Sequence, residues 1–148
     1  MAMCSFYFYP PQQFLCCMTR KSLAQFFSEQ ESWQHTLDYI LQQNIELKNS
    51  LSAIDSKMID ADVLEQLEKF QNRFIEKDVL ISLLRHDIIS LEELLKNDYS
   101  NELQYLQIVR KHESLKKDIQ RLEVEFILLK SKFNIFLNNL THNTDYEA

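Results

Sequence analysis

The chain has 148 residues with no glycine and two prolines, and its formal net charge is −6. Phosphate-binding loops and tight hairpin turns depend on glycine, so this composition argues against nucleotide-loop chemistry and against sheets with short turns. A content of 45% hydrophobic and 26% charged residues without glycine is typical of long helices. The negative charge disfavours nucleic acid as a partner, and no apolar run reaches the roughly 18 residues of a membrane span.

Residues 1–19 differ in composition from the rest of the chain. They carry no charge before Arg20, and they contain all three cysteines, which are Cys4, Cys16 and Cys17. A secretory signal's basic start and small-residue cleavage site are missing. We expect the segment to be disordered, or not translated if Met18 is the true first residue. A main body without cysteine fits a reducing compartment, so we expect a cytoplasmic location.

Residues 20–61 are expected to form a first coiled-coil helix. From Leu23, apolar residues recur at alternating spacings of three and four, the period of a coiled-coil seam. The a positions of this first block are Leu23, Gln30, Leu37, Asn44, Leu51 and Met58, and the d positions are Phe26, Trp33, Ile40, Leu47, Ile54 and Ala61.

Residues 62–140 hold two more heptad blocks in different phases. The second block has its a positions at Leu67, Phe74, Ile81, Ile88 and Leu95, with Val63, Phe70, Lys77, Leu84 and Leu91 at d. The third has a positions at Tyr105, His112, Ile119, Phe126, Phe133 and Leu140, with Ile108, Leu115, Leu122, Leu129 and Phe136 at d. These blocks predict a helical hairpin or one long interrupted helix, followed by a frayed tail over 141–148.

The changes of phase locate two breaks. At 55–62 we expect a true break, with Asp62 and Glu65 at capping-box spacing for the next helix. At 96–101 a turn and a continuous helix with an altered supercoil both remain open. A turn would place the acidic stretch 55–102, with 6 basic and 12 acidic residues, beside the more basic 110–132, with 7 basic and 4 acidic.

The hairpin alternative also predicts which residues meet. If the chain folds back near Tyr99, positions whose numbers sum to about 198 face each other. Arg73 then meets Glu125, and Asp87 meets Lys111. Such exposed pairs contribute a few tenths of a kcal/mol each, so they bear on orientation and not on stability.

Asn44 is the candidate for setting the oligomeric state. It occupies an a position between Ile40 and Leu47. An asparagine in such a layer can pair with the same residue of a second chain and fix a parallel dimer. An equal alternative is a hydrogen bond to another helix of its own chain, because polar core residues do not always specify oligomers.

His112 is the candidate for a pH-sensitive core residue, because it occupies an a position beside Ile108 and Leu115. A buried histidine that titrates near neutral pH can act as a switch. The favoured alternative is a partly exposed, hydrogen-bonded histidine near a bundle end. A metal site is not expected, because positions 108 and 116 are isoleucine and lysine.

A basic edge on the third block is the candidate contact for nucleic acid or an acidic protein surface. Its residues are Arg110, Lys111, Lys116, Lys117 and Arg121. Clustered lysine and arginine supply phosphate contacts. Glu113, Asp118, Glu123 and Glu125 interrupt the cluster, which favours a solvated helix edge instead.

No nucleophile is placed with a base and an orienting group, so we expect no enzyme, cofactor, metal or small-molecule substrate. The segments FQNRFIEKDVLISLLRHDIISLEELL and LKKDIQRLEVEFILLKSKFNIFL resemble short bacterial coiled-coil proteins of no assigned function. The resemblance spans residues 37–140, reflects heptad content and implies no site. We therefore expect an all-α, elongated coiled coil, a hairpin or bundle of two to three long helices. Its expected role is that of a structural or adaptor protein acting through self-association or a helical partner.

Overall fold

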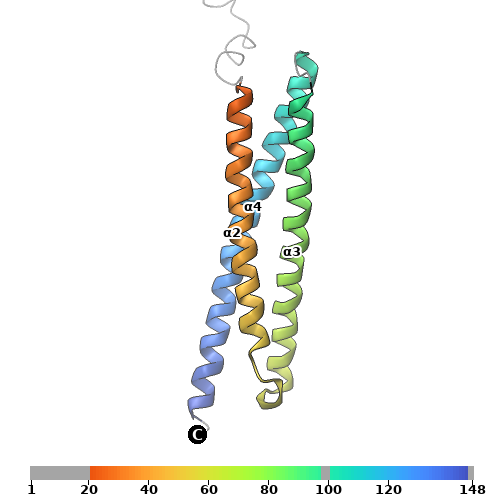
Figure 1. The fold of residues 1–148 in the computed structure, drawn as a ribbon. Helices are drawn as coiled ribbons and strands as arrows, with labels where there is room; N and C mark the ends of the chain where they lie inside the picture. The colour runs from red at the N-terminus through yellow and green to blue at the C-terminus, as the bar shows by residue number, and fades with distance from the viewer. Residues whose placement is uncertain (1–20, 98–100, 147–148) are drawn as a thin grey trace, which may run out of the picture.

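The computed structural model describes residues 21–97 and 101–146, and these residues fold into a bundle of three long helices. The α-helices are α2 (Leu23–Ser52), α3 (Ala61–Lys96) and α4 (Glu102–Tyr146), with a short 3-10 helix η1 (Ser56–Met58) between the first two. Figure 1 shows α2 running one way, α3 returning beside it, and α4 running again in the direction of α2. Since the described residues contain no strand, the predicted all-α class is confirmed.

A capping box that the sequence analysis overlooked starts α2. The Ser22 hydroxyl accepts a hydrogen bond from the Gln25 backbone N–H at 3.3 Å, and the Gln25 side chain accepts one from the Ser22 N–H at 2.8 Å. This reciprocal pair satisfies two donors that the helix leaves open. The helix ends at Ser52 rather than continuing to residue 61. The predicted break at 55–62 is present, with η1 inside it.

The predicted capping box at the start of α3 is wrong. Asp60 is the N-cap residue and its side chain makes no capping hydrogen bond. Asp62 lies in the first turn of the helix, where a carboxylate is favoured by the helix dipole. Glu65 pairs with Lys69 at 2.7 Å on the same helix instead of reaching back to a cap.

α3 and α4 run in opposite directions, so the hairpin alternative is correct. α3 ends at Lys96 and α4 begins at Glu102, and Lys77 Nζ lies 2.7 Å from Glu125 Oε2 across the two antiparallel helices. The predicted partner of Glu125 was Arg73, one helical turn away on α3. That error follows from a register estimated only from the position of the turn. Asp87 and Lys111 line one groove, as the hairpin predicts.

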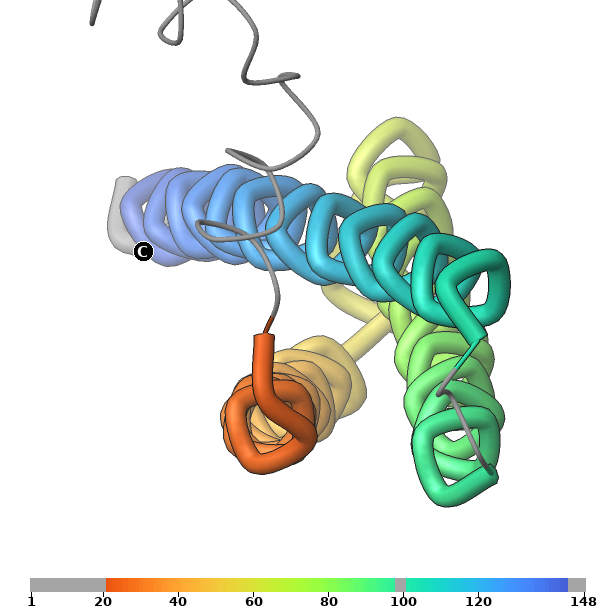
Figure 2. Tube along the Cα trace, turned by 90° about the horizontal axis from the view of Figure 1, so that it is seen from above, coloured from red at the N-terminus to blue at the C-terminus, as the bar shows by residue number. Residues whose placement is uncertain are grey.

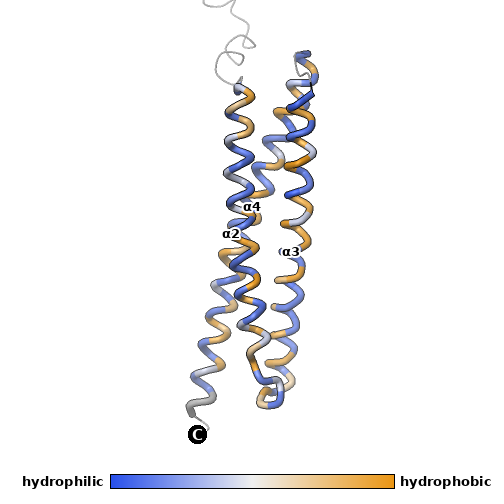
Figure 3. The backbone as a smooth tube through the Cα atoms, in the orientation of Figure 1, coloured by the Kyte–Doolittle hydropathy of each residue, from blue (hydrophilic) through white to orange (hydrophobic). Residues whose placement is uncertain are grey.

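The core lies along the axis where the three seams meet. Buried apolar residues come from all three helices and fall on the predicted a and d positions: Phe26, Trp33, Leu37, Ile40, Leu47, Leu67, Phe74, Ile81, Leu84, Ile88, Leu91, Leu95, Tyr105, Ile108, Leu115, Ile119, Leu122, Phe126, Leu129 and Phe133. Figure 3 shows the matching alternation of hydrophobic and hydrophilic residues along each helix. Burial of this set stabilises the bundle by about 1.5–3 kcal/mol for each large side chain, before chain entropy is counted.

α3 and α4 diverge toward the C-terminal end of α4, as Figures 1 and 2 show. Phenylalanines of both helices fill the wider space there. Phe70 and Phe74 of α3 pack against Phe133, with ring centroids 5.1 Å apart in both pairs, and Phe70 also contacts Phe136 at 5.3 Å. Large rings are suited to this place because they bridge a distance that leucine does not.

α4 continues to Tyr146, beyond the expected end of the seam at Leu140, so most of the expected tail is helical. Thr141 Oγ1 donates a hydrogen bond to the Asn138 carbonyl at 2.9 Å. The expectations for residues 1–19 lie outside the described residues. Within 21–97 and 101–146, no helix is both long and apolar enough to cross a bilayer.

Candidate functional site

Asn44 is fully buried and bonds to α3 of its own chain. Its Nδ2 donates to the Phe74 carbonyl at 2.8 Å and to Asp78 Oδ1 at 2.7 Å. The other oxygen of Asp78 pairs with Lys48 of α2. The structure thus has the intramolecular hydrogen bond that was the alternative to a dimer contact, and it uses both protons of the Asn44 amide.

His112 is more deeply buried than the favoured alternative predicted, with 1% of its surface exposed. Its ring lies between two aromatic residues of α2, Phe26 at 4.8 Å and Trp33 at 4.5 Å between centroids. The Nε2 atom lies 2.9 Å from Glu29 Oε2, but not in hydrogen-bond direction. Lys21 donates to both oxygens of Glu29 at 2.8 and 2.9 Å, so the carboxylate is held between the lysine and the histidine.

The burial of His112 follows from the heptad positions around it. Phe26, Glu29, Gln30 and Trp33 occupy consecutive d, g, a and d positions, which surround an a-position side chain when two helices run parallel. Gln30 is fully buried, and neither amide atom has a hydrogen-bond partner among the described residues. This polar layer, formed by Glu29, Gln30 and His112, therefore interrupts the apolar core a second time, apart from the buried Asn44.

Acidification is expected to weaken the fold through His112. Burial lowers the pKa of His112 below its usual value of 6.5, with Lys21 acting in the same direction and Glu29 opposing both. The unfolded chain therefore takes up the proton first as the pH falls. The contribution of neutral, buried His112 to the free energy of unfolding is therefore complete above about pH 6.5. It decreases below that pH by at most about 1.4 kcal/mol per pH unit. Urea denaturation between pH 5 and 8 measures this dependence.

Three variants identify the group responsible for that pH dependence. His112→Leu is expected to flatten the profile below pH 6.5, whereas His86→Gln, at an exposed position, leaves it unchanged. Glu29→Gln removes the charge that favours the protonated ring, so its stability should fall more steeply with acid. A wild-type profile identical to that of His112→Leu contradicts the assignment to His112.

The predicted basic edge is not gathered into one site. Four of its residues, Arg110, Lys111, Lys117 and Arg121, are exposed, and Lys116 is half-buried. Carboxylates lie beside two of the five, since Lys111 shares a groove with Asp87, and Arg121 lies 3.9 Å from Asp118. The arrangement matches a solvated helix edge more closely than a surface that follows a phosphate backbone.

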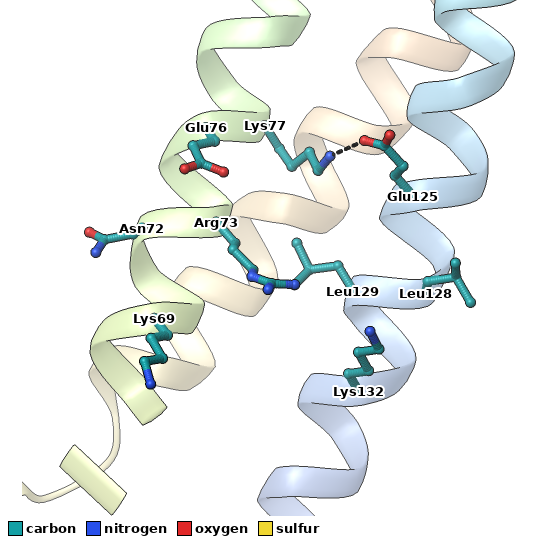
Figure 4. A pocket seen from close by; sticks show the side chains of 9 residues that line it. All are labelled: Lys69, Asn72, Arg73, Glu76, Lys77, Glu125, Leu128, Leu129 and Lys132. Carbon is teal, nitrogen blue, oxygen red and sulfur yellow. Dashed lines mark hydrogen bonds and ion pairs between the residues drawn. The ribbon is translucent and has the colours of Figure 1, made fainter. Parts of the chain in front are cut away.

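A different basic groove lies between α3 and α4, and the sequence analysis missed it. Figure 4 shows the groove, of about 520 Å³, bridged at one end by the Lys77–Glu125 ion pair. It is lined by Lys69, Asn72, Arg73, Glu76, Lys77, Glu125, Leu128, Leu129 and Lys132. In Figure 4, Arg73 reaches from α3 toward Leu129, while Lys132 extends from α4 into the same space.

The cations of this basic groove differ in their ion pairing. Lys77 bonds to Glu125 and lowers the pKa of that carboxyl, first through the hydrogen bond and then through its charge. Lys69 is paired with Glu65. Arg73 and Lys132 have no ion pair with any described residue within 4.0 Å. The groove therefore holds two cations that are free to meet an anionic group.

Lys77→Leu is expected to change the free energy of unfolding by no more than about 1 kcal/mol. The lysine side chain is 14% exposed and Glu125 is 46% exposed, so solvent screens their attraction. Leucine keeps the apolar contact of the stem at this d position and removes the ion pair. A double-mutant cycle with Glu125→Gln measures the coupling. A loss of more than about 1 kcal/mol for Lys77→Leu, together with no coupling to Glu125→Gln, would mean that Lys77 stabilises the fold through a contact other than this ion pair.

Among the described residues, no group of three or more histidine, cysteine, aspartate or glutamate side chains is placed to hold a metal ion. Comparison of the chain with protein-family models, with curated proteins and with solved structures finds no match. The function is therefore inferred from the geometry of the bundle itself.

Proposed function

We propose that this chain is a structural or adaptor protein that binds a helical partner through the outer face of α4. The observation that carries the proposal is an outer stripe of exposed apolar residues, Val124, Ile127, Leu128 and Ile135, which are 59%, 66%, 55% and 58% exposed. A single exposed apolar residue is ordinary, but a contiguous group marks an interaction surface.

The outer stripe lies on one side of α4. Its members are separated by three, one and seven residues, and eleven residues make about three turns of an α-helix, or about 16 Å. The buried seam of the same helix uses Phe126, Leu129 and Phe133 on the opposite side. α4 is thus apolar on two faces, of which the bundle covers one, as expected for a helix with a second neighbour.

A cytoplasmic location is part of the proposal, since the chain has no cysteine after Cys17 and this fits a reducing compartment. A second copy of the chain is the alternative occupant of the stripe. Binding of nucleic acid by the basic edge is less well supported, because carboxylates lie beside Lys111 and Arg121.

Cross-linking of native complexes with mass spectrometry tests the proposal, using a photoreactive group at position 131, an exposed serine between Leu128 and Ile135. The expected product joins α4 to a helical segment of another protein, and Ile127→Glu with Ile135→Glu in the same chain abolishes it. Gln104→Glu with Gln107→Glu, at exposed polar positions, is the matched control and leaves it intact. Light scattering identifies self-association separately. Cross-links that do not depend on positions 127 and 135 contradict the proposal.

A further inference from the structure

The basic groove and the outer stripe of α4 form one continuous surface. Leu128 belongs to both, because it lines the groove and is also 55% exposed on the stripe. A second, smaller hollow of about 240 Å³ continues the groove along α3, sharing Lys69, Arg73 and Lys132 and reaching the ring of Phe70. Ile135 follows Lys132 by less than one turn on α4. A ligand on this surface meets apolar and cationic groups side by side.

We propose that this surface binds an amphipathic helix of a partner protein that carries carboxylates along one edge of its apolar face. The inference rests on the proposed function and specifies the chemistry of the helical partner. Large aliphatic side chains of the partner helix, such as leucine, pack on Leu128 and Ile135. Carboxylates beside them reach Arg73 and Lys132, the two cations of the groove without an ion pair among the described residues.

The charges of the groove favour carboxylates of a partner helix over a nucleic acid. Arginine presents a planar set of donors that binds a carboxylate through two hydrogen bonds. A nucleic acid needs many cations along its length, because its phosphates are closely and regularly spaced. Here Glu76 and Glu125 line the same groove as the cations, and the whole chain carries a net charge of −6. Two free cations suit a few carboxylates placed among apolar side chains.

The dimensions of the surface also fit a short helix. The outer stripe extends over about three turns of α4, about 16 Å. A partner helix of similar length that packs against it presents side chains at spacings of three and four, which match the separation of Val124 from Ile127 and Leu128, and Ile135 follows Leu128 by two such steps. This mode of recognition, an apolar helix face laid on an apolar surface with charges at the edge, is common among helical partners.

The test uses the full chain and a labelled synthetic peptide of about 18 residues with leucine at helical spacings of three and four and glutamate beside the leucines. Matched peptides carry lysine in place of glutamate, or the same residues in scrambled order. Fluorescence anisotropy is expected to detect binding of the glutamate peptide alone. Arg73→Gln with Lys132→Gln should weaken it by roughly tenfold or more, the scale of a lost charged hydrogen bond.

Control variants separate this inference from the proposed function. Arg110→Gln with Lys117→Gln removes two exposed cations elsewhere on α4 and should leave peptide binding unchanged. Arg73→Glu with Lys132→Glu should transfer the preference to the lysine peptide, which a merely structural role would not do. Leu128→Gln with Ile135→Gln should abolish binding of the glutamate peptide. Far-ultraviolet circular dichroism confirms that each variant remains helical.

Several outcomes overturn the inference. Absence of glutamate-peptide binding, equal binding of the scrambled peptide, or binding that does not depend on Arg73 and Lys132 each refutes the acidic-helix partner. If only the Leu128→Gln with Ile135→Gln variant loses binding of the glutamate peptide, the proposed function stands, but the charge of the partner helix is not recognised by the groove. Duplex DNA that binds through Arg73 and Lys132 more tightly than the peptide assigns the groove to nucleic acid instead.

Discussion

Phe133→Ala is expected to lower the free energy of unfolding by about 3–5 kcal/mol, the range for removing a fully buried phenylalanine. Phe133 has no exposed surface and its ring packs edge-on against both Phe70 and Phe74. Its loss leaves a cavity between α3 and α4. Urea denaturation followed by circular dichroism measures the change.

Ile135→Ala is the matched control for Phe133→Ala. It lies two residues further along α4, and its side chain is 58% exposed. The free energy of unfolding should stay within about 0.5 kcal/mol of the wild-type value. A small effect at Phe133 would mean that the aromatic contact between α3 and α4 is absent in solution. A large, concentration-dependent effect at Ile135 would mean that a second copy covers the outer stripe.

Asn44→Ala is expected to lower the free energy of unfolding by about 2 kcal/mol, because it removes two hydrogen bonds, one of them to a carboxylate. Asp78 keeps its ion pair with Lys48, which limits the loss. Asn49→Ala, at an exposed position of the same helix, should change stability by less than about 0.5 kcal/mol. Urea denaturation of the three proteins measures both differences.

A double-mutant cycle between Asn44→Ala and Asp78→Ala tests the contact itself. Neighbours in one hydrogen-bond network usually couple by about 0.5–3 kcal/mol. Absence of coupling would show that the amide bonds elsewhere. Light scattering of the Asn44→Ala protein addresses the dimer role, since a residue that sets register between two chains changes the distribution of oligomers when it is removed.

The faces of the helices and the first break were predictable from the sequence because both depend on local spacing. Apolar residues three and four apart form one stripe on any α-helix, so Leu37, Phe74 and Leu122 are buried as their heptad positions predict. The capping box of Ser22 and Gln25 was equally readable from its spacing.

The register and the basic groove were not predictable in the same way. The turn between α3 and α4 contains neither glycine nor proline, so the spacing alone does not fix where the chain reverses. A shift of one turn along α3 exchanges Arg73 for Lys77 as the partner of Glu125. The register between α3 and α4 also determines whether Arg73 and Lys132 line the same groove. Charge pairs of a few tenths of a kcal/mol are too weak to determine this register.

The parallel course of α2 and α4 has a consequence for how the bundle folds. α2 with α3, and α3 with α4, are neighbours in the chain, whereas contacts between α2 and α4 join residues about eighty or more positions apart, such as Trp33 with His112 and Gln43 with Lys130. Closing a longer loop costs more entropy, so the contacts of α2 with α4 are expected to form after a hairpin exists.

If a hairpin forms before α2 meets α4, substitutions at different contacts should affect the folding and unfolding rates differently. His112→Leu, at the contact of α2 with α4, should change mainly the unfolding rate, whereas Leu84→Ala, in the middle of the central helix, should also slow folding. Stopped-flow denaturation measures both rates. Substantially slower folding of the His112 variant would mean that α4 meets α2 before either hairpin is complete.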